Sequence, residues 1–116
     1  MSETLALAKK YLNKKVTVTV DRPLGSKHPK HGFEYMANYG FIEGVLAPDG
    51  EDLDAYYLGV TTPLEKAEGM CIAVVHRTSD DDDKLVVVPE DVTYTDAEIE
   101  SAIEFQEKWF DHEIVR

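Results

Sequence analysis

Five strand-like segments follow one another through this chain, and only turns or loops separate them. Residues 16–20, Val-Thr-Val-Thr-Val, alternate strictly between apolar and polar side chains, which indicates a strand with one buried face. The other four are rich in aromatic or β-branched residues and lie at 33–46, 53–60, 70–76 and 84–88. Helical patterns occur at the two ends, so the chain lacks the alternation of a doubly wound fold. We therefore expect a mainly β (α+β) fold, a small closed sheet with packed helices.

The two end helices have recognisable start signals. Ser2 can cap a first helix that runs to about Leu12. Residues 95–98, Thr-Asp-Ala-Glu, have the spacing of a capping box and begin the last helix. Positions 99, 102, 103, 106, 109 and 110 share one face of that helix. This pattern predicts that Trp109 and Phe110 are core anchors.

The bulk properties limit the function classes. A length of 116 residues suits a single domain over residues 1–116. A net charge of −11 disfavours nucleic acid as a partner, and no segment approaches the ~20 apolar residues of a membrane span. The N-terminus has no signal-peptide pattern, so we expect a cytoplasmic protein. Cys71 lies in an apolar run and is predicted to be a small buried residue.

An acidic cluster follows an aromatic stretch and suggests a metal site. Asp49, Glu51, Asp52 and Asp54 place four carboxylates within six residues. Such a run repels itself unless a cation lies within it. Mg²⁺ takes oxygen ligands, commonly one or two carboxylates together with waters and substrate phosphates. The alternative interpretation is a solvated acidic turn.

The chain also has one cationic stretch, the loop at residues 21–32. After Asp21 it contains no acid, and its basic residues are Arg22, Lys27, His28, Lys30 and His31. A phosphate substrate can bind to so acidic a protein only where metal ions or clustered cations reverse the local charge. The loop is therefore a candidate for phosphate binding, with an ordinary exposed turn as the alternative.

The order of these motifs resembles that of the family I soluble inorganic pyrophosphatases. The resemblance rests on Tyr-x-x-Asn-Tyr-Gly-Phe-Ile at 35–42 and Asp-Gly-Glu-Asp-Leu-Asp at 49–54. It also rests on Asp-Arg-Pro at 21–23 and Asp-Asp-Lys-Leu-Val-Val-Val-Pro at 82–89. It implies an OB-fold-like five-stranded barrel with an N-terminal and a C-terminal helix. It also implies a homo-oligomer that hydrolyses pyrophosphate with Mg²⁺, or with Mn²⁺ as an alternative metal.

The resemblance also implies roles for individual residues. Asp49, Asp54 and Asp82 would bind metal, Asp80 could join them, and Asp21 matches an acidic site residue. Lys30 and Lys84 would contact phosphate, Tyr39 would hydrogen-bond near the metal or phosphate, and Tyr35 would line the pocket. Glu51 stands where the family has the Asp expected to assist the attacking water. Glu is longer by one methylene, and a shift of roughly one ångström at a reacting group can cost about 10²-fold in rate.

The phosphate half of the motif set departs further from the family pattern. A hairpin that carries an Arg before Tyr35 is missing, and Lys27, His28 or His31 could replace its charge. Trp109-Phe110 stands where the family has a Tyr-Lys pair. Three functions therefore stay open: pyrophosphate hydrolysis, hydrolysis of another phosphoanhydride such as a nucleotide or sugar nucleotide, and a binding module without catalysis.

Overall fold

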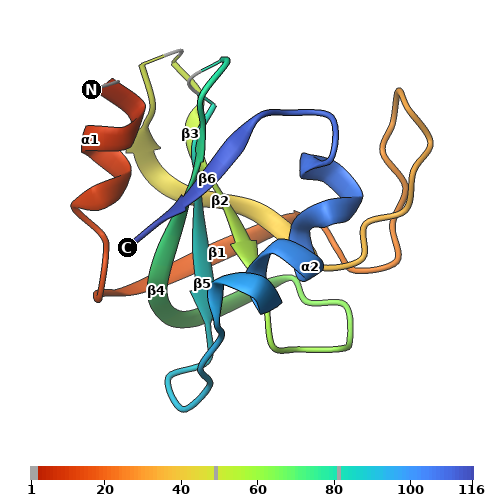
Figure 1. Cartoon of the computed structure of the whole chain (residues 1–116). Helices are drawn as coiled ribbons and strands as arrows, with labels where there is room; N and C mark the ends of the chain where they lie inside the picture. Colours follow the sequence, from red (N-terminus) through yellow and green to blue (C-terminus); the bar gives the residue numbers. More distant parts are fainter. Residues whose placement is uncertain (1–2, 49, 81) are drawn as a thin grey trace.

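The structure, a computed structural model, describes residues 3–48, 50–80 and 82–116. Within these ranges there are two helices and six strands. Figure 1 shows how they are arranged. In order they are α1 (Glu3–Lys9), β1 (Lys15–Arg22), β2 (Asn38–Leu46), β3 (Asp52–Tyr57), β4 (Lys66–Arg77), β5 (Lys84–Val88), α2 (Asp96–Glu107) and β6 (His112–Val115).

Strands β1 to β5 close into a barrel, because the two ends of the sheet pair with each other. The strand order is β1-β2-β3-β5-β4, and an additional β1–β4 pairing completes the closure. Strand β4 is twelve residues long, so its first part pairs with β1 and its last part pairs with β6. The predicted five-stranded barrel with a helix near each end is confirmed. The short sixth strand was not predicted, because four residues are too few for a recognisable period.

Two apolar clusters hold the barrel together. One fills its interior with residues such as Val18, Leu53 and Leu85, and α1 packs against it. The other lies between the barrel and α2, where Ile99 and Ile103 are fully buried. Both faces of β3 are covered by these clusters, so the adjacent residues Tyr56 and Tyr57 are both buried.

The end of α2 differs from the prediction. The helix stops at Glu107, and the chain turns there to begin β6. Trp109 consequently lies outside the helix with 57% of its surface exposed, so the prediction that it anchors the core was wrong. Phe110 is half-buried. Likewise, α1 ends at Lys9 rather than near Leu12.

Cys71 is fully buried in the barrel interior, as its apolar surroundings predicted. Within the described ranges, no helix has the length and apolar character needed to cross a membrane.

Candidate active site

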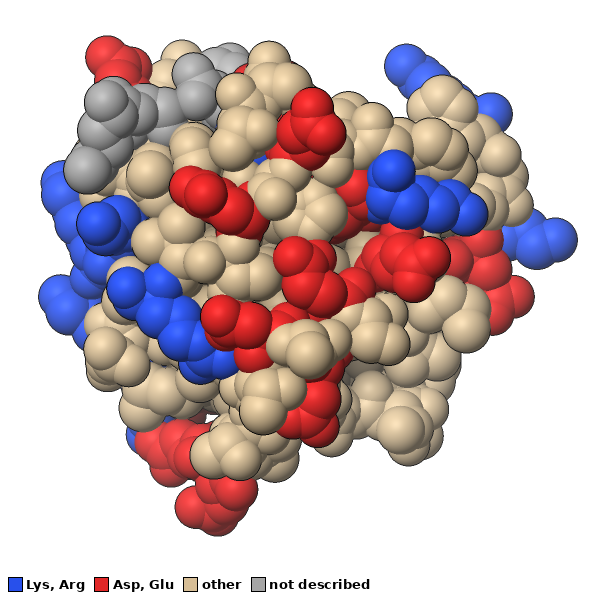
Figure 2. Space-filling view, in the orientation of Figure 1, with Lys and Arg blue, Asp and Glu red and all other residues tan. Residues whose placement is uncertain are grey.

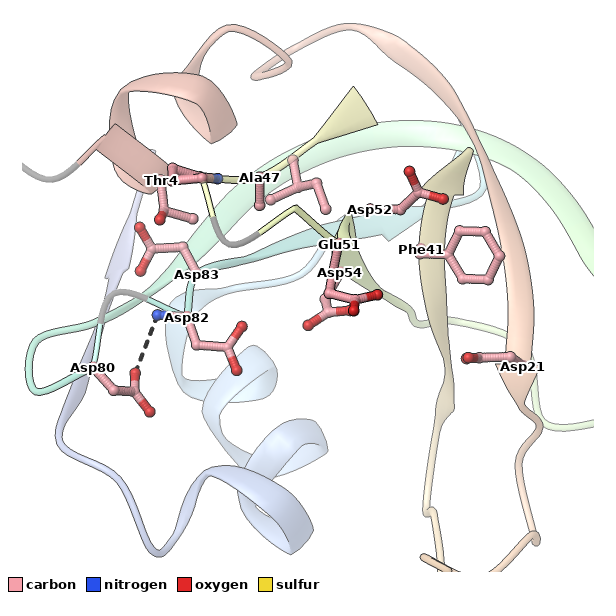
Figure 3. Close-up of a pocket in the computed structure, with 12 residues that line it drawn as sticks. Thr4, Asp21, Phe41, Ala47, Glu51, Asp52, Asp54, Asp80, Asp82 and Asp83 are labelled. Carbon is pink, nitrogen blue, oxygen red and sulfur yellow. Dashed lines mark hydrogen bonds between the residues drawn. The ribbon is translucent and has the colours of Figure 1, made fainter. Parts of the chain in front are cut away.

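Two adjoining cavities share a charged floor, which consists of Asp54 and Asp82 with Lys84 between them. The first, the acidic cavity, has a volume of about 660 Å³ and is lined largely by carboxylates, seen as sticks in Figure 3. The second, the aromatic cavity, has a volume of about 870 Å³. Asp21, Asp54 and Asp82 line both cavities.

The floor is set by the parallel pairing of β3 with β5, which places Asp54 directly beside Lys84. The Lys84 Nζ atom lies 3.1 Å from Asp54 Oδ2 and 3.1 Å from Asp82 Oδ1. Lys84 itself is 1% exposed. A buried ammonium group requires partners of opposite charge, and these two carboxylates supply them.

Burial changes the acid–base properties of the floor. It raises the pKa of the Asp54 carboxyl above its ordinary value, Lys84 opposes that rise, and Asp82 adds to it. Tyr39 lies against Asp54, and burial together with the neighbouring carboxylates holds its pKa well above the usual value. The Tyr39 hydroxyl therefore keeps its proton at neutral pH.

A second buried cation, Arg77, ends β4 at the same floor. Its Nε and Nη2 atoms donate to Glu107 Oε1 and Oε2 at 2.8 and 3.0 Å. Its Nη1 atom lies 3.3 Å from Asp82 Oδ2 and 3.4 Å from Asp80 Oδ2. The guanidinium group also lies 3.8 Å from the centre of the Phe110 ring. Burial alone would lower the pKa of Arg77, but the bonds to Glu107 outweigh it and raise the pKa.

Further hydrogen bonds hold Glu107, the partner of Arg77, in place. The Tyr56 hydroxyl donates to Glu107 Oε2 at 2.5 Å and accepts from Gln106 Nε2 at 2.7 Å. The side chains of this network are all buried, namely Tyr56, Arg77, Gln106 and Glu107. A network with each member paired is rigid, so Arg77 is held in one position.

Two residues of the aromatic motif are structural. The buried Asn38 side chain accepts from the backbone N–H groups of Leu24 and Leu64 and donates to the Thr62 carbonyl. Gly40 lies so close to the Thr19 carbonyl that a Cβ atom would clash with it. Gly40 therefore allows β2 to approach β1 closely, and Asn38 ties the start of β2 to two neighbouring loops.

The donor chemistry of the acidic cavity fits a hard divalent cation. In Figure 3 the Asp82 carboxylate points toward Asp54 and Glu51. The Asp54 side chain is partly withdrawn from water there. Among the described residues, no three His, Cys, Asp or Glu side chains lie close enough together to hold an ion by themselves. Mg²⁺ commonly needs one or two carboxylates and takes its remaining ligands from water and phosphate, so the residues fit such an ion.

A model of the inorganic pyrophosphatase family matches residues 8–114, nearly the whole chain. The chain belongs to the inorganic pyrophosphatase family. Among curated relatives, inorganic pyrophosphatase of Pseudomonas aeruginosa is 44% identical over 64 residues, and inorganic pyrophosphatase 1 of Pseudomonas syringae pv. tomato is 41% identical over 64 residues. Each match covers 49% of this chain and 35% of the relative, so the match spans about a third of the relative's length.

Solved pyrophosphatase structures share the fold. The inorganic pyrophosphatase of Ehrlichia chaffeensis superposes with a TM-score of 0.68 at 19% identity, covering 88% of this chain and 85% of its own. The inorganic pyrophosphatase of Neisseria gonorrhoeae superposes with a TM-score of 0.62 at 24% identity, and the match covers 78% of this chain and 70% of that protein. At these identities the likeness supports the pyrophosphatase barrel itself.

Most residues predicted for the pyrophosphatase site lie together. The acidic cavity is lined by Asp21, Glu51, Asp54, Asp80 and Asp82, and the aromatic cavity by Tyr35, Tyr39 and Lys84. Asp49 lies outside the described residues. Lys27 and Lys30 are exposed in the loop before β2 and line neither cavity. Their predicted contact with phosphate, like the other assigned roles, stays a prediction.

Sequence reasoning missed the buried cation and its partner. Arg77 ends an apolar strand directly before the acidic run at 80–83, which is a detectable signal. Glu107 continues the spacing of Ile99 and Ile103 at intervals of four residues. An acid on the apolar stripe of a helix requires a buried partner, so this spacing is a signal that could have pointed to a cation opposite α2.

Proposed function

We propose that the chain is a divalent-metal-dependent phosphoanhydride hydrolase that converts inorganic pyrophosphate into two phosphates. Its membership of the pyrophosphatase family supports the proposal. The observation that carries it is Lys84, buried between Asp54 and Asp82 at the floor that both cavities share. This floor combines oxygen donors for a metal with cations for a phosphate.

The metal would be held by carboxylates of the acidic cavity. Asp54 and Asp82 are the candidates at the shared floor, Asp80 lies beside them, and Asp21 lines the opposite side. Asp49 would join them on the evidence of its sequence motif. Bound Mg²⁺, or Mn²⁺ as the alternative, neutralises phosphate charge and lowers the pKa of a coordinated water.

Side chains of the protein would bind the phosphate and accept the proton of the attacking water. Lys84 and Arg77 offer fixed positive charge to the phosphate oxygens, which stabilises charge that develops on the leaving group. Tyr39 keeps its proton and can donate a hydrogen bond to a phosphate oxygen. Glu51 lines the acidic cavity and is the candidate that accepts the proton of the attacking water.

Buried cations are needed because the surrounding surface is acidic. Figure 2 shows Asp and Glu side chains across the middle of one face, with Lys and Arg toward its edges. Such a surface repels a polyanion, so binding depends on local charge at the floor. Tyr35 lines the wall above it, and Lys27 and Lys30 lie on the neighbouring loop, from which they could approach a bound phosphate.

Phosphate release from pyrophosphate tests the proposal. We expect turnover by the full chain with Mg²⁺ or Mn²⁺, and none after chelation with EDTA. Absence of release at micromolar protein, with metal binding shown by calorimetry, would contradict it. We further propose a cytoplasmic homo-oligomer without nucleic-acid or membrane partners. Light scattering of the purified chain tests the assembly, and a single-chain mass would contradict it.

A further inference from the structure

Apart from Tyr39, the rings that form one wall of the aromatic cavity have no role in the proposed hydrolysis of pyrophosphate. The rings come from three separate parts of the chain: the loop between β1 and β2, strand β2, and the segment after α2. Phe33 lies at their centre. Its ring centroid is 4.9 Å from His28, 5.4 Å from Tyr35 and 5.3 Å from Trp109.

Trp109 is the most unusual member of this wall. It is the single Trp of the chain, and 57% of its surface is exposed although it lines the cavity. It therefore contributes little to the core. Ligand sites combine apolar and aromatic walls with a few convergent polar groups, and an aromatic face at such a site can stack on a planar ring.

The ring wall and the charged floor belong to one cavity. Arg22, Arg77 and Lys84 line it together with Phe33 and Trp109. A pyrophosphate ion bound at the floor would leave the ring wall empty. The volume of about 870 Å³ is typical of sites for much larger ligands. A ligand that fills the whole cavity needs a phosphate chain at one end and a planar ring at the other.

We propose that the aromatic cavity is a nucleobase subsite, and that nucleoside di- and triphosphates are substrates of the same site. The proposal rests on the phosphoanhydride hydrolysis proposed above. Water oxygen forms a bond to the terminal phosphorus, and the bond from that phosphorus to the bridging oxygen breaks. The electron pair leaves with the bridging oxygen on the shortened nucleotide, and the proton released from the water passes through Glu51 to solvent.

Binding measurements on the full chain with Mg²⁺ test the subsite separately from turnover. The two probes are the β,γ-imido analogue of adenosine triphosphate and tripolyphosphate, which carries three phosphates and no base. Stacking of a base on aromatic side chains is worth about tenfold or more in affinity. We expect the nucleotide analogue to bind at least about tenfold more tightly by calorimetry and to quench the fluorescence of Trp109.

Single-residue variants test whether the ring wall causes this difference in affinity. Phe33→Ala and Trp109→Ala should weaken binding of the nucleotide analogue until its affinity equals that of tripolyphosphate. The affinity for tripolyphosphate itself should stay unchanged. Leu46→Ala is the matched control, because Leu46 is an apolar residue about as exposed as Trp109 and does not line the aromatic cavity. It should preserve the advantage. Equal affinity of the two probes, or an equal loss for both in Phe33→Ala, would overturn the subsite.

The two proposals fail in different ways. Pyrophosphate turnover without a nucleotide advantage would leave the proposed hydrolase intact and reject the subsite. A nucleotide advantage that depends on Phe33, together with release of phosphate from adenosine triphosphate, would support the subsite. Tight nucleotide binding without hydrolysis of any phosphoanhydride would reject the substrate role and the hydrolase together.

Discussion

Arg77 and Glu107 form a buried, two-pronged ion pair that joins the end of β4 to the last turn of α2. The pair fixes a cation beside Asp82 at the floor of the candidate site. Helix α2 is therefore more than a cover for the barrel, because one of its side chains positions a charge that faces the cavity.

Replacing Glu107 with Gln should destabilise the fold strongly. The change leaves the Arg77 charge buried without its main partner, and breaking a buried pair in this way costs about 3–5 kcal/mol. Denaturant unfolding followed by circular dichroism measures the loss. Glu104→Gln, which removes the same charge from an exposed position of α2, is the control and should change little. Similar stabilities for the two variants would contradict the role given to the pair.

His112 should make stability depend on pH. Burial alone would lower its pKa, but hydrogen bonds to Glu100 and to the Phe110 carbonyl outweigh burial and raise the pKa. Because the folded value exceeds the unfolded value of about 6.5, the stabilisation is complete below about 6.5 and is lost as pH rises through the folded value. We expect the free energy of unfolding to fall over this range. His112→Gln should flatten the fall, and an unchanged slope would contradict the assignment.

The Cys71 thiol should be unreactive toward alkylating reagents in the folded protein. Burial raises the pKa of its thiol to about 11, so almost no thiolate exists at pH 8. It is the single cysteine of the chain, so labelling reports on it alone. Iodoacetamide should modify the protein in guanidinium chloride and leave it unmodified without denaturant. Rapid labelling of the native protein would show that the barrel interior opens to solvent.

Lys84 should hold the pKa of Asp54 below the value that burial alone would impose. Its ammonium group opposes the rise caused by burial and by Asp82. Lys84→Met should therefore raise the carboxyl pKa further, which carbon-13 NMR titration can follow without any activity. Lys66→Met removes an exposed charge outside both cavities and should leave the titration unchanged. A fall in the Asp54 pKa after Lys84→Met would contradict the ion pair between Lys84 and Asp54.

The barrel was predictable because its signals are local. The alternation of β1 has the period of a strand, and the short β-branched run of β5 is typical of a strand buried on both faces. The capping box at Thr95 marks the start of α2. Most of the acidic cavity could also be predicted, because its carboxylates belong to recognisable motifs. These features depend on residues close together in sequence.

The pairing of Arg77 with Glu107 could not be derived in the same way. The two residues are thirty positions apart, and the barrel closure and the docking of α2 bring them together. The exposure of Trp109 depends on the turn into β6, which carries no periodic signal. Contacts set by tertiary packing therefore account for the errors, and they also created the aromatic cavity.

Turnover of pyrophosphate by matched aspartate variants tests the central claim most directly. Asp54 lies at the shared floor, whereas Asp91 is exposed and lines neither cavity. Loss of the Asp54 charge removes a proposed metal ligand and a partner of Lys84, so with Mg²⁺ we expect Asp54→Asn to lower kcat/KM by about 10²-fold or more. Asp91→Asn should retain the wild-type value. Equal phosphate release by the two variants would contradict the assignment of this floor as the active site.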